Sequence, residues 1–103
     1  MLFDVDYFGQ SGYHWAAKRG YTVILNILIL GGNHINLLDN KRRTPLFLAA
    51  QWNNYEICEL LLNQGANPFI LNIDENRAID VTTNRSIKNL LFRWMDVNTF
   101  LFI

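Results

Sequence analysis

One segment of the chain occurs twice, at a fixed separation of 33 residues. Residues 44–50 read TPLFLAA, and residues 11–17 read SGYHWAA. An apolar run and then a glycine follow each copy, Gly32 after the first and Gly65 after the second. A repeat of this length predicts one supersecondary unit that stacks on copies of itself, so repetition rather than a catalytic constellation organises the chain.

Both copies carry residues at positions that define a known repeat family. The first copy places there Asp6, Gly9, Ser11, Tyr13, His14, Ala16, Ala17, Gly20, Ile24, Ile27, Leu28, Gly32 and Asn36. The second copy places there Asp39, Thr44, Pro45, Leu46, Ala49, Ala50, Ile57, Leu60, Leu61, Leu62, Gly65 and Ala66. The chain therefore resembles the ankyrin repeat family, whose consensus joins an Asp-x-x-Gly turn to Thr-Pro-Leu-His and paired alanines. The resemblance implies an all-α solenoid of stacked helix-turn-helix units with hairpin-like loops.

A third, shorter copy follows the second. Residues 78–81 read AIDV, and Ile87 in residues 87–91 lies 30 positions after Ile57, three short of a full period. We expect the missing residues to come from the segment between the two helices of this unit. Terminal repeats are atypical because one of their faces has no neighbour, so this copy is interpreted as a C-terminal cap. The expected organisation is one domain over residues 1–103, with units at about 6–38, 39–71 and 72–95 and a tail at 96–103.

Local signals predict where the first helix of each unit begins and ends. Ser11 and Thr44 precede the helices, and their hydroxyls can accept a hydrogen bond from a first-turn N–H. Pro45 then occupies the first helical position, where its missing donor costs nothing. Gly20 and Asn53 follow the helices and tolerate the positive φ that a chain reversal needs.

The second helix of each unit carries apolar residues at spacings of three and four, which predicts one buried face. These residues are Ile24, Leu25, Ile27 and Leu28 in the first unit and Ile57, Cys58, Leu60 and Leu61 in the second. Gly32 and Gly65 are expected to end these helices.

Composition is typical of a single soluble domain, with half of the 103 residues apolar and a formal net charge of zero. No apolar run approaches the roughly 20 residues that a membrane-spanning helix needs. The first residues have no basic stretch ahead of an apolar one, so they do not read as a secretory signal. One cysteine excludes an internal disulfide and favours a reducing compartment, so we expect an intracellular protein of the cytoplasm.

The residues with reactive side chains are better explained by structure than by catalysis. His14 and His34 have no second metal ligand at a suitable spacing, and Cys58 occupies an apolar position on a helix. The combination of Ser11, His14 and Asp6 imitates a hydrolytic triad, but the resemblance assigns all three to structural positions and His14 to a hydrogen bond within the turn. No glycine-rich phosphate loop is present. We therefore predict no enzyme activity, no cofactor and no metal site.

In ankyrin arrays the hairpin tips and the exposed face of the first helices form a concave surface that carries recognition, as the resemblance implies. Repeat positions place on this surface Tyr7, Phe8, Gln10, Lys18, Arg19, Asn40, Lys41, Arg43, Gln51, Trp52, Ile73, Asp74 and Asn76. The repeat itself requires none of these residues, so we expect their side chains to be free for contact with a protein. Tyr, Trp and Arg often dominate the binding energy at protein interfaces.

Two features of this surface have alternative interpretations. Trp52 either contacts a partner or packs against Trp15 or the neighbouring first helix. The basic cluster at residues 41–43 is a solvated loop tip, a protein contact or a nucleic-acid contact, and zero net charge weighs against nucleic acid. Because Lys18 and Arg19 share this side, the surface is expected to be basic and to favour an acidic contact region on a protein partner.

The function that the sequence favours is a non-enzymatic module for protein interaction, such as an adaptor, an inhibitor or an accessory subunit. Two alternatives remain open: the recognition segment of a larger enzyme, and a structural subunit of a multiprotein assembly. The apolar residues at 94–95 and 99–103 are consistent with the second, because such a tail should bury itself against something. The sequence leaves the oligomeric state open.

Overall fold

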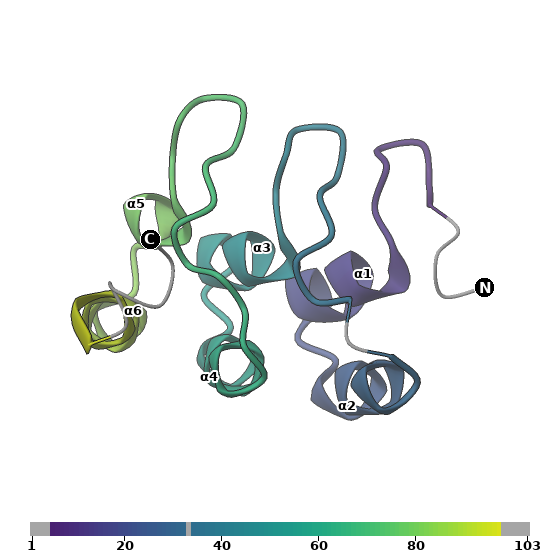
Figure 1. Cartoon of the computed structure of the whole chain (residues 1–103), viewed down its shortest axis with the longest axis horizontal. Coiled ribbons are helices and arrows are strands. Elements are labelled where there is room, and N and C mark those ends of the chain that lie inside the picture. Colours follow the sequence, from purple (N-terminus) through teal and green to yellow (C-terminus); the bar gives the residue numbers. More distant parts are fainter. Residues whose placement is uncertain (1–4, 33, 98–103) are drawn as a thin grey trace.

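The computed structural model of the chain describes residues 5–32 and 34–97. The helices in this part of the chain are α1 (Gly12–Arg19), α2 (Thr22–Leu30), α3 (Pro45–Gln51), α4 (Tyr55–Asn63), α5 (Ala78–Val81) and α6 (Arg85–Val97). Figure 1 shows α1, α3 and α5 in an inner row and α2, α4 and α6 in an outer row, with three hairpin-like loops rising on the side away from the outer row. The all-α stack of helix pairs with hairpin-like loops that the sequence predicts is therefore confirmed.

The inner helices begin where the sequence predicts. Ser11 is the N-cap of α1 and Thr44 is the N-cap of α3, both with extended backbone. Thr44 Oγ1 accepts a hydrogen bond of 3.0 Å from the backbone N–H of Phe47. The next residue, Pro45, lies at the first helical position of α3, so the fixed φ of proline starts the helix at no cost in hydrogen bonds.

The reversals after the inner helices are also as predicted. Gly20 and Asn53 lie 33 residues apart and have φ values of 76° and 59°. Asn54, which follows Asn53, links the first two units. Its side-chain amide donates hydrogen bonds to the carbonyls of Ala17 and Lys18, at 2.8 and 3.1 Å. The turn at the end of one inner helix therefore fixes the position of the next helix pair.

The third unit is shorter than the second, but the missing residues do not come from the segment that the sequence suggests. The connections between inner and outer helices are equal in length, residues 52–54 and residues 82–84, but α5 has four residues where α3 has seven. The expectation of a shortened connection is therefore wrong. The helix ends early because Thr82 takes an extended conformation and donates its hydroxyl to Asn53 Oδ1 at 2.9 Å.

Helix α6 continues beyond the expected end of the third unit. It runs to Val97, whereas the sequence placed the start of a tail at Asp96. Met95 is buried and Trp94 packs against the core, so these two apolar residues belong to the third unit. The expectations for the apolar tail at 99–103 lie outside the described residues. No helix in the described ranges has the length and apolar character needed to cross a membrane.

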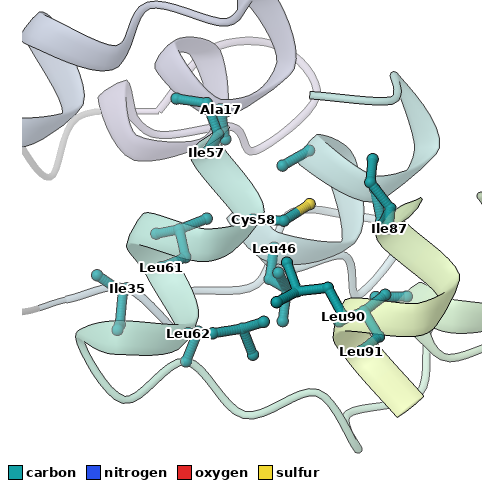
Figure 2. Close-up of a cluster of buried hydrophobic side chains, with 14 of the residues drawn as sticks. Ala17, Ile35, Leu46, Ile57, Cys58, Leu61, Leu62, Ile87, Leu90 and Leu91 are labelled. Carbon is teal, nitrogen blue, oxygen red and sulfur yellow. The ribbon is translucent and has the colours of Figure 1, made fainter. Parts of the chain in front are cut away.

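One apolar cluster runs through all three units. Figure 2 shows part of it, with Cys58 and Leu61 of α4, Leu46 of α3, and Ile87 and Leu91 of α6. All five side chains are fully buried. The paired alanines of α1 and α3 are buried as well, which is consistent with close packing between the inner helices.

The predicted buried face holds for α4 but not for α2. Ile57 of α4 is buried, whereas Ile24 and Ile27 of α2 are exposed and only Leu25 is fully buried. Helix α2 is the first of the outer row, and in the part of the chain that the structure describes no helix lies beyond it (Figure 1). The periodicity identified the apolar positions correctly, but burial also requires a neighbouring unit.

Replacing Leu61 with Ala should lower the free energy of unfolding by about 2 to 5 kcal/mol, because the change opens a cavity in the central unit. Urea denaturation followed by circular dichroism measures this change. Leu71 provides the control, since its side chain is exposed and Leu71→Ala should change the free energy of unfolding by less than about 0.5 kcal/mol. Equal losses in the two variants would contradict the observed packing.

Candidate interaction surface

The three hairpins share one construction. Asp6, Asp39 and Asn72 are their first residues, and the side-chain Oδ1 of each accepts hydrogen bonds of 2.8 to 3.1 Å from the backbone N–H groups two and four residues later. A backbone bond from the first residue to the fifth, such as Asp6 N–H to Gln10 O at 3.1 Å, closes each loop. The loop conformation therefore depends on the first residue and not on the side chains at its tip.

The fourth residue of each hairpin has positive φ: 73° at Gly9, 61° at Arg42 and 62° at Glu75. Only the first of these is glycine, so the loops of units two and three hold ordinary residues in a conformation that is uncommon for them. The two side-chain hydrogen bonds and the closing backbone bond compensate for this cost.

Neighbouring hairpins are bonded to one another. The backbone N–H of Asn40 donates to the carbonyl of Phe8 at 3.0 Å, and the N–H of Ile73 donates to the carbonyl of Lys41 at 3.1 Å. Both bonds join equivalent positions of consecutive units. The second and third residues of the hairpins thus form one continuous row, which we call the tip row: Tyr7, Phe8, Asn40, Lys41, Ile73 and Asp74.

All six side chains of the tip row are exposed, and Tyr7 is 91% exposed. Their chemistry changes from unit to unit, although the backbone beneath them does not. The first tip is aromatic, with Tyr7 and Phe8 in an edge-to-face contact at 5.4 Å between ring centroids. The second tip is basic, and the third combines Ile73 with Asp74 and Glu75. The surface that the sequence predicts to be basic therefore has basic residues at its second tip and acidic residues at its third.

The end of α1 holds a cluster around Trp15 that sequence reasoning missed. The Lys18 ammonium lies 4.8 Å and the Arg19 guanidinium carbon 4.6 Å from the centre of the Trp15 ring system. Trp15 Nε1 donates a hydrogen bond of 2.8 Å to Asp6 Oδ2. The predicted contact residues Lys18 and Arg19 thus stack on an aromatic ring, which their positions three and four residues after Trp15 could have indicated.

Gln51 and Trp52 lie at the end of α3 and are exposed, with Trp52 at 59%. Trp52 does not take part in the cluster around Trp15, whose ring is occupied by Lys18 and Arg19. Contact with a partner therefore stays a prediction for Trp52.

Three predicted contact residues do not project from the surface: Gln10, Arg43 and Asn76. All three are the fifth residue of their hairpin, whose carbonyl closes the loop. Gln10 is only 3% exposed; its Nε2 donates to Asp39 Oδ2 at 3.2 Å, and its Oε1 has no partner among the described residues. Arg43 donates from Nε to the same carboxylate oxygen at 2.8 Å. Asn76 is half-buried. The expectation that these side chains are free is wrong for Gln10 and Arg43, because both bond to Asp39.

Asp39 is a buried carboxylate that accepts hydrogen bonds from several donors. Burial by itself would raise its pKa, but hydrogen bonds from the Arg43 backbone, the Gln10 amide and the Arg43 guanidinium outweigh burial and lower the pKa. The charged form therefore persists in the folded chain and joins the first unit to the second.

His14 forms a second link between these two units. Its Nδ1 accepts a hydrogen bond of 3.1 Å from the Ser11 backbone N–H and lies 2.9 Å from Ser11 Oγ. Because the Arg43 carbonyl can only accept, Nε2 must be the donor in the 2.8 Å contact between them. His14 therefore bonds within its own turn, as expected, and also to the next hairpin. Burial lowers its pKa and keeps the imidazole neutral.

The remaining reactive groups are engaged in structure. Asp6 accepts hydrogen bonds from backbone N–H groups of its loop and from Trp15, and not from His14 as a hydrolytic triad would require. The bond from the backbone N–H of Gln10 is the largest cause of its lowered pKa. Burial raises the pKa of the Cys58 thiol to about 12, so Cys58 is the inert buried residue that the sequence suggested. Within the described residues, no three metal-ligating side chains gather in one place.

Comparison with known proteins identifies relatives across most of the chain. A family model described as ankyrin repeats in three copies matches residues 2–72. Protein phosphatase 1 regulatory subunit 12A of Mus musculus is 36% identical over 73 residues, which is 71% of this chain and 7% of that protein. BCL-6 corepressor-like protein 1 of Homo sapiens is 32% identical over 85% of this chain, and Inversin of Mus musculus is 33% identical over 82%. The chain spans only 5% and 8% of the lengths of these two relatives.

The buried neutral His14 predicts a dependence of stability on pH. Its pKa is lower in the folded than in the unfolded chain, so the free energy of unfolding should be highest above the unfolded pKa of about 6.5 and should fall as the pH drops below it. Urea denaturation between about pH 7 and pH 5, where histidine is the side chain that changes charge, measures this slope.

His14→Gln should flatten this pH slope while lowering stability at pH 7, because the link to Arg43 is altered. His34→Gln is the matched control, since His34 is exposed. A slope that persists in His14→Gln and disappears in His34→Gln would contradict the assignment.

Proposed function

This chain belongs to the ankyrin repeat family, and from this premise we propose that it is a non-enzymatic module that binds another protein across the tip row and the exposed end of α3. Ankyrin repeats are a non-catalytic unit for protein interaction. The finer assignment is an adaptor, inhibitor or accessory subunit whose contacts include Tyr7, Lys41 and Trp52.

The observation that carries this proposal is the contrast between backbone and side chains in the tip row. The three hairpins have the same hydrogen bonds and the same φ pattern, yet equivalent positions hold Tyr7, Asn40 and Ile73. These side chains are exposed, and the hydrogen bonds that hold the loops are made without them, except that Asn40 Nδ2 donates to the Tyr7 carbonyl at 3.3 Å. Varied side chains on a rigid, repeated backbone are typical of a recognition surface.

The three tips differ in chemistry, so they favour a partner whose own groups follow one another in the complementary order. Tyr7 and Phe8 offer an apolar contact, and Lys41 and Arg42 favour an acidic contact region next to it. Asp74 and Glu75 favour a basic group beyond that. The basic tip is small and lies beside an acidic one, so a protein suits this surface better than the continuous negative charge of nucleic acid.

The names of the relatives support a regulatory or adaptor role. One is a regulatory subunit of a phosphatase and another is a corepressor-like protein. Their far greater length is also consistent with the alternative that this module is the recognition segment of a larger enzyme. The single cysteine of the chain favours a reducing compartment and so supports an intracellular, cytoplasmic location.

Trp52→Ala should weaken binding to the partner by about 2 kcal/mol or more without changing the fold, because an exposed tryptophan at an interface commonly dominates the binding energy. A photoreactive amino acid at Tyr7 first captures the partner, and calorimetric titration of that partner with both forms of the chain then gives the affinities.

The same photoreactive group at Glu59 is the control for capture, because Glu59 is exposed on the outer helix α4. Capture of the same protein from both positions, or an unchanged affinity of Trp52→Ala, would contradict the proposed surface.

The double substitution Lys41→Gln and Arg42→Asn should slow association with the partner and reduce its salt dependence, with less effect on dissociation. Asparagine suits position 42 because it tolerates the positive φ found there. Arg43 stays unchanged because it bonds Asp39. Stopped-flow rates measure the effect, and Lys88→Gln on α6 is the control. A wild-type rate that does not respond to salt would exclude an acidic contact region.

A further inference from the structure

A groove lies between α4 and α6, which are neighbours in the outer row of helices (Figure 1). Its hollow has a volume of about 450 Å³. The residues that line it, which we call the α4–α6 groove, are Tyr55 of α4 and Ser86, Asn89, Phe92 and Arg93 of α6. The four residues of α6 are spaced by three and four positions, so they share one face of the helix.

The polar side chains of the α4–α6 groove can all donate hydrogen bonds. They are the hydroxyls of Tyr55 and Ser86, the amide of Asn89 and the guanidinium of Arg93. No acidic residue lines the groove within the described part of the chain. The ion pairs found among the described residues do not include Arg93, so its charge is available to a ligand. A convergent set of donors with one positive charge favours an anion.

The preceding unit shows that the repeat does not require these donors. Ile87 and Ile57 are both buried, so α6 and α4 align with an offset of 30 residues. The positions of Ser86, Asn89 and Arg93 then correspond to Glu56, Glu59 and Asn63 on α4. Two acidic side chains are thus replaced by neutral donors and a neutral one by a cation. Both helices fold and pack, so the donor set is a particular feature of α6.

The hollow on the other side of α4 has the opposite character. It lies toward α2, is lined by Glu56 among others, and has no basic residue among the described residues that line it. An anion is therefore repelled in that hollow and attracted in the α4–α6 groove. The difference between the two hollows comes from side chains and not from the arrangement of the helices, which the repeat keeps the same.

The single positive charge indicates which anion fits. A guanidinium binds a carboxylate through two parallel hydrogen bonds, and the hydroxyl and amide donors beside Arg93 can bond the remaining lone pairs. A phosphate group carries a charge of about −1.5 to −2 at pH 7 and is usually bound by a cluster of arginines. The α4–α6 groove has one arginine, so a carboxylate suits it better than a phosphate.

The exposure of the groove indicates where the carboxylate comes from. All four lining residues of α6 are exposed, whereas a site for a small molecule encloses most of its ligand. A side chain presented by a protein needs no such enclosure. Phe92 is 64% exposed and offers that protein an apolar contact next to Arg93. Aromatic residues and arginine are enriched where proteins contact one another.

We propose that the α4–α6 groove binds the carboxylate of an Asp or Glu side chain of a protein partner, with Arg93 as its counter-ion and Phe92 as the adjoining apolar contact. Figure 1 shows the outer row on the opposite side of the inner helices from the hairpin loops. The groove is therefore a contact separate from the tip row. The inference does not depend on the proposed function, because its evidence lies on different helices and a different face.

Titration of the isotope-labelled full chain with the capped dipeptide acetyl-Phe-Glu-amide, followed by NMR, tests this proposal. The backbone amide signals of Ser86, Asn89 and Arg93 are expected to shift and to saturate. Arg93→Gln should weaken binding about fivefold with unchanged circular dichroism, because it removes the counter-ion. Lys88→Gln is the matched control and should change the affinity less than about twofold, since Lys88 is an exposed cation of α6 that does not line the groove.

Three further probes separate the charge, the kind of anion and its source. The dipeptide with Gln in place of Glu should not bind measurably, the one with phosphoserine should bind more weakly than the carboxylate, and acetate alone should bind more weakly than the dipeptide. Equal binding of the Gln and Glu peptides would overturn the proposal, as would equal effects of the two variants or the absence of saturable shifts at the groove. Tighter binding of the phosphoserine peptide would overturn the assignment to a carboxylate, and acetate binding as tightly as the dipeptide would overturn the assignment to a protein side chain.

Discussion

Each hairpin depends on a single side-chain oxygen at its first residue. Asp6, Asp39 and Asn72 place Oδ1 where it accepts two backbone N–H groups of the same loop. These bonds satisfy donors that a surface loop otherwise exposes to water and stabilise the residue at positive φ. Because the first residue fixes the loop conformation, the side chains at the tip are not needed to stabilise the loop. The variable tip row is a consequence of this arrangement.

The second carboxylate oxygen determines how tightly consecutive units are joined. Asp39 Oδ2 accepts one hydrogen bond from the side chain of Gln10 in the first unit and one from the side chain of Arg43 in its own hairpin. Asn72 has no second oxygen, and the position of the arginine is taken by Asn76. The third unit is joined to the second through neutral bonds between Asn53 and the threonines at 82 and 83. The charged link through Asp39 therefore joins the first two units, while apolar packing continues through all three units.

The sequence predicted the features whose causes are local. Ser11 and Thr44 cap helices and Gly20 and Asn53 reverse the chain because each acts on its own backbone. The 33-residue offset also predicted which residues occupy equivalent positions in consecutive hairpins, such as Tyr7 and Asn40. Without side-chain contacts, the same offset could not show that Gln10 and Arg43, the fifth residues of the first two hairpins, bond to Asp39.

The errors arise where burial depends on another unit. Ile24 and Ile57 occupy the same repeat position with the same residue, yet only Ile57 is buried, because only the second unit has a neighbour ahead of it in the described residues. The early end of α5 has a similar origin, since Thr82 leaves the helical conformation to bond Asn53 of the preceding unit. Such contacts join different units, so the helix propensity of a single segment does not predict them.

A chain of zero net charge can still discriminate between partners through the order of its tips. Apolar, basic and acidic groups follow one another along the tip row, at positions joined by backbone hydrogen bonds. Salt screens the charges of the tips beyond a Debye length of about 10 Å, so the basic second tip attracts an acidic group of a partner mainly over short distances. At contact, a partner aligned in the reverse direction would place like charges together, which costs free energy. Rigid loops maintain this order before binding and reduce the entropy lost on association. The neutral composition therefore favours selectivity of register and direction over strong general attraction.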